Sequence, residues 1–378
     1  MSIFLGFVLL NATAFAEQRF PPPDFESGYH LPPTATPAPR AEYMQYVDGM
    51  VLLGALALAL WFVYRSRSRR GITALSIFSL AYFGFYRKGC VCAIGSVQNV
   101  ALALCDSHYV LPLTVLVFFL APLLVALFAG RAFCAAVCPQ GALQDLVLIR
   151  PIKVPAWLEA ALGIIPHLFL GAGVIFAATG NGFLICRFDP MVPFFRFSGS
   201  LLMITLGGAF LVVGMFVGRP YCRFLCPYGA LLRLVTVAAK WRVRVTPDTC
   251  TQCALCQHSC PFGAMREPTP QKSEPLPSAR RRLAGLLLLL PVLMGLCAWG
   301  GSKLALASHF AELGGWVFGA WAGLVIGGKL TALSVRHNRT DFEPDSSACF
   351  ACARCFETCP SERMRRGLIP LEPVHKEE

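Results

Sequence analysis

Residues 250–261 read CTQCALCQHSCP, and residues 349–360 read CFACARCFETCP. In both runs four cysteines are spaced C-x-x-C-x-x-C-x-x-x-C and are followed by proline, which is the spacing of loops that bind bacterial-type [4Fe–4S] clusters. Three thiolates on one tight loop can each reach a different iron of a cubic cluster. The fourth cysteine, held by the proline that ends the loop, typically binds the neighbouring cluster. The sequence therefore predicts two [4Fe–4S] clusters with crossed ligation.

The predicted ligands form two crossed sets. Three cysteines of the first run join the last cysteine of the second run: Cys250, Cys253, Cys256 and Cys359. The reciprocal set consists of Cys349, Cys352, Cys355 and Cys260. A pair of zinc sites is the alternative interpretation. Zinc prefers two C-x-x-C pairs that lie apart in the sequence, whereas these cysteines are contiguous and end at a proline, so the cluster interpretation is favoured.

The rest of the chain has the composition of a membrane protein. Of its 378 residues, 56% are hydrophobic and 14% are charged, and the mean hydropathy is +0.58. Soluble domains carry about 25% charged residues, so an ordinary cytosolic enzyme and a disordered chain are both excluded. A net charge of +12 would point to nucleic acid in a soluble protein. In a membrane protein it reflects the excess of Lys and Arg in cytoplasmic loops, and no nucleic-acid partner is expected.

Seven apolar stretches are expected to be transmembrane helices, because a span takes roughly 20 apolar residues and backbone groups in lipid must be paired within the segment. They lie near 47–64, 71–86, 109–129, 157–179, 199–217, 283–299 and 312–334. The predicted fold class is an all-α polytopic membrane protein with about seven transmembrane helices. It carries a small cytoplasmic ferredoxin-like α+β module that is split by the last two helices.

Basic residues set the predicted orientation. Four arginines follow the first apolar stretch and should be cytoplasmic: Arg65, Arg67, Arg69 and Arg70. Alternating from there, the inside segments are 65–70, 130–156, 218–282 and 335–378, which contain most of the 33 lysines and arginines. Both cysteine runs fall in inside segments, a result that does not depend on the cysteines themselves. We expect a protein of the bacterial inner membrane with a periplasmic N-terminal tail and a cytoplasmic C-terminus.

The predicted organisation has six parts. Residues 1–16 are a signal peptide ending in Ala14-Phe15-Ala16, with an uncleaved hydrophobic tail as the alternative. The remaining parts are a proline-rich periplasmic segment (17–46), a transmembrane domain (47–240), the first half of the ferredoxin module (241–282), a transmembrane hairpin (283–334), and the second half of the module with the tail (335–378).

A second cysteine pattern occurs twice at the ends of apolar stretches. Residues 130–143 read GRAFCAAVCPQGAL, and residues 218–231 read GRPYCRFLCPYGAL. Both copies are predicted at the inner membrane face. Together they offer four thiolates, enough for an additional iron–sulfur centre: Cys134, Cys138, Cys222 and Cys226. A redox-active dithiol or a packing motif of small residues is the alternative.

A weaker echo of this pattern is predicted on the opposite face. Residues 92–100 (CAIGSVQNV) match residues 138–146 (CPQGALQDL) in their Cys, Gly and Gln, and residues 186–188 repeat the Cys-Arg-Phe of residues 222–224. Similar motifs on opposite faces indicate inverted repeats. Cys90, Cys92 and Cys186, with Cys105 as a further candidate, would hold an outer-face centre. The alternatives are a disulfide and, for Cys105, a small core residue.

The two C-x-x-x-C-P copies and the two [4Fe–4S] runs together resemble the NapH/NosR family of membrane polyferredoxins, over roughly residues 80–362. The resemblance implies that the motif cysteines bind clusters. It also implies electron transfer between the quinone pool or cytoplasmic donors and periplasmic reductases or flavoproteins, notably in respiratory nitrogen-oxide pathways. NosR-type proteins carry a periplasmic flavin-binding domain as well. The tail 17–46 is too short for one, so we expect the membrane and ferredoxin part alone.

The partners expected from this resemblance are the lipid bilayer and redox proteins: a membrane or periplasmic flavoprotein or cytochrome, and a cytoplasmic ferredoxin. Quinone is a further candidate. The chain is expected to be an electron-transfer subunit of an oxidoreductase complex in the membrane rather than a stand-alone enzyme.

Two other functions are compatible with the motifs. Accessory ferredoxins of copper oxidases, the FixG type, have similar cysteine motifs and serve assembly or regulation, but they carry a periplasmic immunoglobulin-like domain where this chain is expected to end inside. A quinol-oxidising enzyme would need a quinone pocket, to which His167 could contribute. A lone histidine beside Pro166 is more typical of helix packing or backbone bonding, and without a histidine partner no haem is predicted.

Overall fold

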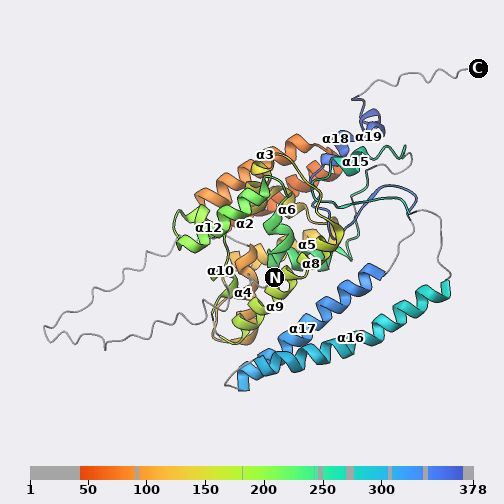
Figure 1. Cartoon of the computed structure of the whole chain (residues 1–378). Helices are drawn as coiled ribbons and strands as arrows, with labels where there is room; N and C mark the ends of the chain where they lie inside the picture. The colour runs from red at the N-terminus through yellow and green to blue at the C-terminus, as the bar shows by residue number, and fades with distance from the viewer. Residues whose placement is uncertain are drawn as a thin grey trace, which may run out of the picture. The chain divides into compact units, whose positions relative to one another are not determined.

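The computed structural model describes residues 43–89, 93–180, 182–241, 243–245, 250–269, 276–304, 309–334 and 339–368. The predicted signal peptide, residues 17–42 of the proline-rich segment, and Cys90 and Cys92 lie outside these ranges. Within them the protein is mostly helical (Figure 1). The two strands in the described part, β1 (Met265–Arg266) and β2 (Glu343–Pro344), pair with each other in antiparallel register.

All seven predicted apolar stretches are helical. They correspond to α2 (Tyr43–Leu60) with the π-helical turn η1 (Trp61–Arg65), α3 (Arg69–Ser79) with the π-helical turn η2 (Leu80–Tyr86), α5 (Leu113–Ala129), α8 (Ala156–Leu162) with α9 (Ile165–Ala178), α12 (Leu201–Gly214), α16 (Leu276–Leu304) and α17 (His309–Ser334). Within the described ranges, three segments are long and apolar enough to cross a membrane: Tyr43–Arg65, Ala156–Ala178 and Leu313–Thr331.

One apolar helix does not follow from the hydropathy pattern. It is α4 (Ala93–Cys105), in which Ser96 and Gln98 are buried. Polar side chains therefore interrupt the apolar run on the face that packs inward. The Nε2 group of Gln98 donates to the carbonyl of Gly173 in α9 at 3.3 Å, so tertiary hydrogen bonding replaces the hydration that this face would otherwise need.

The last two long helices, α16 and α17, form an antiparallel hairpin (Figure 1). Glycines spaced four residues apart on α17 allow close contact: a Cβ on Gly323 would lie 2.6 Å from the Cα of Met294, and one on Gly319 would overlap the backbone of Cys297. Small residues at this spacing let helix backbones approach in membranes. The backbone of Cys297 thus lies in this helix contact. On its other side, α17 contacts α9, where the indole N–H of Trp321 donates to the carbonyl of His167 at 2.8 Å.

Each C-x-x-x-C-P copy folds into two short helices. The first copy forms α6 (Ala132–Ala136) and α7 (Pro139–Val147), and the second forms α13 (Pro220–Phe224) and α14 (Pro227–Thr236). In both copies the second cysteine is the N-cap of the later helix and the proline is its first residue. Proline is favourable there because its missing N–H would be unpaired in any case.

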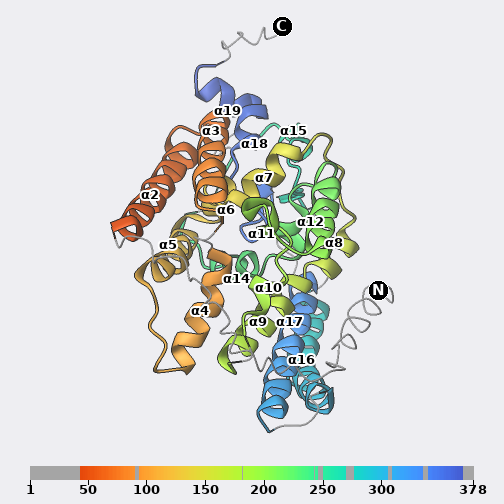
Figure 2. The ribbon, with the colours of Figure 1, turned by 90° about the vertical axis from the view of Figure 1, so that its left-hand side faces the viewer.

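The short elements of the remaining chain complete the fold. Two small helices follow α9 and precede α12 in the sequence: α10 (Leu184–Arg187) and α11 (Val192–Arg196). The cysteine runs contain α15 (Leu255–His258), α18 (Arg354–Thr358) and α19 (Pro360–Arg365). Figure 2 shows α18 and α19 beside α3, and the Nη1 of Arg69 in α3 donates to the carbonyl of Cys352 at 3.2 Å.

Candidate iron–sulfur sites

The two cysteine runs meet in space, although α16 and α17 separate them in the sequence. Strand β1 follows the first run and pairs with β2, which precedes the second. The hydroxyl of Thr358 donates to that of Ser259 at 3.0 Å, and the N–H of Thr269 donates to the carbonyl of Arg339 at 3.0 Å. These contacts become possible because the α16–α17 hairpin returns the chain to its starting side.

The cysteines group across the two runs rather than within each run. Cys250, Cys253, Cys256 and Cys359 line one cavity together with Val245 and Phe342. Burial raises the pKa of Cys256 to about 11, and the neighbouring sulfurs of Cys359, Cys250 and Cys253 add to the rise. The structure therefore brings together the first crossed set of the sequence analysis.

The reciprocal set is also assembled. Burial raises the pKa of Cys349 to about 12, with further contributions from the sulfurs of Cys352 and Cys260. The pKa of Cys355 is raised as well. Burial is the main cause, and the sulfurs of Cys349, Cys352 and Cys260 add to the rise. Cys260 belongs to the first run, so this group crosses the runs in the opposite sense.

Both loops share an unusual backbone. The residues two and four positions after the first cysteine have positive φ in each run: Gln252 (53°) and Ala254 (58°) in one, Ala351 (56°) and Ala353 (63°) in the other. Alternation of right- and left-handed residues points successive N–H groups into a concave nest, an arrangement found at iron–sulfur sites. The N–H of Ala351 accordingly donates to the sulfur of Cys349 at 3.4 Å. A positive φ at a residue other than glycine costs conformational energy, and such residues cluster at functional sites.

The described residues do not contain three Cys, His, Asp or Glu side chains placed to bind a single metal ion. The sulfurs instead surround cavities. A polynuclear cluster spreads its thiolates in this way, because each thiolate binds a different iron. The donor set, four thiols per group with backbone N–H groups directed at sulfur, fits an iron–sulfur cluster.

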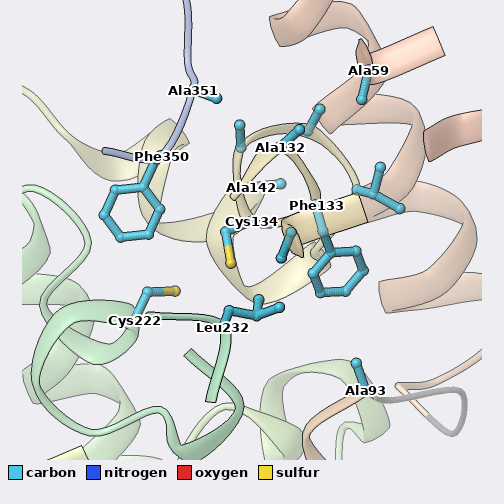
Figure 3. Packing of buried hydrophobic residues seen from close by; sticks show 14 of the residues in the cluster. Ala59, Ala93, Ala132, Phe133, Cys134, Ala142, Cys222, Leu232, Phe350 and Ala351 are labelled. Carbon is cyan, nitrogen blue, oxygen red and sulfur yellow. The ribbon is translucent and has the colours of Figure 1, made fainter. Parts of the chain in front are cut away.

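The cysteines of the two C-x-x-x-C-P copies form a further group, the four-cysteine site. Cys134, Cys138, Cys222 and Cys226 line one cavity. Figure 3 shows the side chains of Cys134, from α6, and Cys222, from α13, directed into the same space. Three of the four are buried, and Cys138 is half-buried. Sequence-distant copies of one motif are thus placed face to face.

Glycines in the motif permit this close approach. A Cβ on Gly141 would lie 2.7 Å from the carbonyl oxygen of Cys134, and a Cβ on Gly229 would lie 3.1 Å from that of Cys222. Each glycine therefore lets its second helix pack against the cysteine turn of the same copy. The N–H of Gly229 also donates to the sulfur of Cys226 at 3.3 Å.

Burial keeps the thiols of the four-cysteine site in the neutral form unless a metal binds them. Burial raises the pKa of Cys222 to about 11, although the guanidinium of Arg219 acts to lower it. The sulfur of Cys134 adds to the rise. Burial also raises the pKa of Cys226, with the sulfurs of Cys222 and Cys138 adding to it. Thiols so placed stay protonated on their own, whereas coordination to a metal deprotonates them. Hydrogen bonds to sulfur, such as that from Gln144 to Cys222 at 3.3 Å, would stabilise the thiolates.

Two arginines connect the four-cysteine site to the cysteine runs. The guanidinium of Arg131 lies over the ring of Phe350 at 4.1 Å, and that of Arg219 lies over Phe262 at 5.6 Å. The two phenylalanine rings contact each other with centroids 4.7 Å apart. Gly218 adds to the contact, because a Cβ there would lie 2.7 Å from the carbonyl oxygen of Pro261.

Asp145 is the main carboxylate at this junction. Although burial opposes ionisation, the guanidiniums of Arg219, Arg69 and Arg354 hold the pKa of Asp145 well below its usual range. The ion pairs measure 3.0 Å, 2.9 Å and 3.6 Å respectively. Sequence reasoning did not identify Asp145 or the roles of Arg131 and Arg219. The arginine that precedes each C-x-x-x-C-P by three residues is visible in the repeat and was the available signal.

The weaker copy of the motif, residues 92–100 and 186–188, lies within the described residues except for its first position. Gln98 Oε1 accepts the N–H of Ile185 at 2.9 Å, and Gln144 Oε1 accepts the N–H of Tyr221 at 3.0 Å. Each glutamine thus binds the residue that precedes the cysteine of a Cys-Arg-Phe sequence, so the structure repeats the same hydrogen bond in both halves. A Cβ on Gly95 would lie 3.1 Å from the sulfur of Cys186.

The remaining sequence candidates lie apart from these groups. Cys105 ends α4 and is exposed, about 18 Å from the start of that helix at 1.5 Å per residue. It is neither beside Cys186 nor a core residue. The imidazole Nδ1 of His167 lies 3.0 Å from the carbonyl oxygen of Gly163, which is the backbone-bonding arrangement expected of a histidine in the first turn of a helix. His167 does not line the cavity of the four-cysteine site.

Comparison with known proteins supports this assignment of motifs. A family profile described as a 4Fe-4S binding domain matches residues 111–156, 200–245 and 254–271. The first two stretches contain the two C-x-x-x-C-P copies, and the third begins inside the first cysteine run and extends past β1. The match and the relatives, among them a putative electron transport protein and a ferredoxin-type protein, support an iron–sulfur electron-transport role for this chain.

The relatives are similar to this chain over different shares of its length. YccM of Escherichia coli (strain K12) is 28% identical over 37% of this chain and 43% of its own length. Protein NirI of Paracoccus denitrificans is 29% identical over 59% of this chain and 34% of its own length. Regulatory protein NosR of Pseudomonas aeruginosa is 26% identical over 70% of this chain and 40% of its own length. The chain thus spans less than half the length of these relatives. No solved structure matches it.

Proposed function

We propose that this protein carries electrons through the membrane face between two cytoplasmic [4Fe–4S] clusters and a redox partner on the periplasmic side. Bound iron–sulfur clusters would supply one-electron chemistry. Cys250, Cys253, Cys256 and Cys359 would hold one cluster, and Cys349, Cys352, Cys355 and Cys260 the other. Cys134, Cys138, Cys222 and Cys226 would hold an additional iron–sulfur centre. The crossed grouping of sulfurs and the N–H nests of both loops support the first two sets.

The observation that carries this proposal is the contact between the second cysteine run and the four-cysteine site. Phe350 directly follows Cys349 and stacks on Arg131, and Nη2 of Arg131 lies 3.9 Å from the sulfur of Cys134. Electron tunnelling weakens steeply with distance, so adjacent centres form a usable path. A protein that stored or assembled clusters independently would not need the sites to share packed side chains.

The membrane topology is part of the proposal. The cytoplasmic module is assembled from residues 241–282 and 335–378, and the transmembrane part comprises about seven spans in segments 47–240 and 283–334. Contacts of the basic segment that follows α2 support the proposal that both halves of the module lie on one side of the membrane. Arg67 pairs with Glu362 at 2.8 Å, and Arg69 contacts the second cysteine run. By the positive-inside bias, this side faces the cytoplasm of a bacterial inner membrane and the segment 17–46 faces the periplasm.

An outer-face centre at Cys90, Cys92 and Cys186 would continue the path toward a periplasmic flavoprotein or cytochrome. The repeated glutamine hydrogen bond supports it, because Gln98 positions Cys186 as Gln144 positions Cys222. A cytoplasmic ferredoxin or the quinone pool would serve the opposite end, with the chain as a subunit of a membrane complex.

The test is anaerobic purification of the full chain in lipid nanodiscs, followed by iron and sulfide analysis and electron paramagnetic resonance (EPR). We expect at least about eight iron atoms per chain from two cubic clusters, and a further signal that Cys134→Ser abolishes while the ferredoxin-type signals remain. Colourless protein, or zinc in place of iron, would reject the proposal. Cys297→Ser is the matched control, because Cys297 belongs to none of the three groups.

A regulatory role is the second candidate, and the name of the relative NosR favours it. A regulator would sense redox state at the same sites without sustained electron flow. Turnover distinguishes the two roles. With excess dithionite as the electron source, an electron carrier in nanodiscs should reduce an external acceptor over many turnovers, whereas a sensor should reduce no more acceptor than its own clusters can supply.

A further inference from the structure

Arg131 is a fully buried cation for which the described part of the chain supplies no carboxylate partner. Its side chain has no exposed surface, and no Asp or Glu in the described part of the chain forms an ion pair with it. Nη1 donates to the carbonyl of Ser347 at 3.4 Å, Nη2 reaches the sulfur of Cys134 at 3.9 Å, and the guanidinium stacks on Phe350. Its Nε is buried and has no hydrogen-bond partner. These contacts are weak compensation for a buried charge.

The related arginine of the second copy is compensated differently. Arg219 is equally buried and pairs with Asp145 at 3.0 Å. It also donates to the carbonyls of Cys134 and Ala135. Removing two charges from water is tolerated when good geometry and further hydrogen bonds accompany the pair, and Arg219 has both. The two copies thus place a guanidinium at the same point of the motif with different partners.

The repeat itself explains why Arg131 lacks a carboxylate. Asp145 follows Cys138 by seven residues, and the residue at the same distance from Cys226 is Arg233. The position that would pair with Arg131 by the symmetry of the repeat is therefore a second cation. Burial, and after it the nearby charge of Arg131, lower the pKa of Arg233 to about 10. The Nε of Arg233 is likewise buried without a partner.

An excess of buried positive charge requires an anion nearby. The thiol of Cys134 lies 3.9 Å from Nη2 of Arg131, and the thiols of the four-cysteine site become thiolates when they bind iron. A cluster held by four thiolates carries net negative charge, and it becomes more negative on reduction. Net charge and hydrogen bonds to sulfur set the reduction potential of such clusters. A fixed guanidinium in this position therefore favours the reduced state.

Building on the proposed function, we propose that Arg131 is a positioning residue that supplies the countercharge of the centre at Cys134, Cys138, Cys222 and Cys226 and raises its reduction potential. Through Phe350 the same guanidinium also sets the spacing between that centre and the second cysteine run. The ligand class is thus an anionic, thiolate-bound iron–sulfur cluster rather than a neutral dithiol or a disulfide.

The test compares Arg131→Gln and Arg131→Lys in the full chain in nanodiscs, by EPR-monitored redox titration. The signal to follow is the one that Cys134→Ser abolishes. Arg131→Gln should shift its midpoint to a lower potential, Arg131→Lys should retain most of the wild-type value, and the signal that Cys253→Ser abolishes should stay unchanged. Arg266→Gln is the control, because Arg266 pairs with Asp345 on the exposed surface at 3.0 Å.

If a variant binds less iron, the size of the EPR signal that depends on Cys134 provides a second measurement. Loss of the signal in Arg131→Gln with retention in Arg131→Lys also supports a requirement for charge. An unchanged midpoint in Arg131→Gln overturns the proposal, and so does equal loss of the signal in both variants, because shape rather than charge would then be the requirement. Wild-type protein without any signal sensitive to Cys134→Ser would reject the proposed centre itself, which separates that failure from a failure of the role of Arg131.

Discussion

Glu362 is fully buried and pairs with Arg67 at 2.8 Å, although the two residues belong to opposite ends of the chain. The same arginine lies over the ring of Phe356 at 4.7 Å. The basic segment that would normally serve only as a positive-inside anchor is therefore also the docking point of the second cysteine run. This single relationship ties the segment after the first long helix to the second cysteine run.

Glu362→Gln should loosen the second cysteine run. The substitution keeps the shape of the side chain and leaves Arg67 without its carboxylate. We expect a loss of about 3 kcal/mol, at the lower end for a broken buried pair, because Arg67 retains some solvent contact. Hydrogen exchange of residues 339–368 measures the effect. Arg363→Gln is the control, since Arg363 is exposed on the same helix, α19. Equal exchange in both variants would contradict the docking role.

Asp145→Asn should destabilise the junction between the repeats and the cysteine runs. It removes the only ion-pair carboxylate of buried Arg219 among the described residues, for an expected cost of about 3–5 kcal/mol. Arg266→Gln breaks an exposed pair and should cost at most about 1 kcal/mol. Thermal unfolding of both proteins in the same detergent provides the comparison. Similar melting temperatures would show that the buried pairs at Asp145 contribute little.

The effect of Asp145→Asn should not depend on pH near neutrality. The pKa of Asp145 is depressed, so its stabilising contribution is complete above the unfolded-state pKa of about 4 and is lost as pH falls through the lower folded value. Wild type and Asp145→Asn should therefore differ by a constant amount between about pH 5 and 8. A difference that grows across this range would show that another titrating group is coupled to the site.

Gly141→Ala should disrupt the four-cysteine site selectively. The Cβ of the alanine would lie 2.7 Å from the backbone oxygen of Cys134. The backbone of the two helices would have to move apart to relieve this contact. We expect loss of the EPR signal that depends on Cys134 and retention of the ferredoxin-type signals. Gly208→Ala in α12 is the matched control, because its Cβ would meet nothing within 4 Å. Retention of all signals in Gly141→Ala would show that the helices can separate without losing the centre.

The crossed grouping of cysteines makes an assignment that single variants can check. Cys359→Ser should abolish the same EPR signal as Cys253→Ser, because both residues line one cavity. Cys260→Ser should instead affect the signal that depends on Cys352. If Cys359 and Cys352 share a signal, each run binds its own cluster and the crossed assignment is wrong.

Several elements could be predicted from sequence because they depend on local pattern. The seven apolar stretches are helices, since hydropathy over one segment decides that. The pairing of the two C-x-x-x-C-P copies follows from their repetition. Helix α4 was missed because Gln98 and Ser96 are buried, so its inward face is polar. The break between α8 and α9 was also missed, although Gly163 at the end of α8 and Pro166 in the first turn of α9 were the available signal.

The sequence by itself determined which residues bear sulfur, how they are spaced, and which segments are apolar, because these properties are local to each segment. Only the tertiary structure decided that Arg131 is buried without a carboxylate partner among the described residues, while Arg219 pairs with Asp145. It also decided that Phe350 and Phe262 stack between the cysteine runs and the repeats. Such partners lie far apart in the chain, and their energies depend on burial and distance, which the order of residues does not specify.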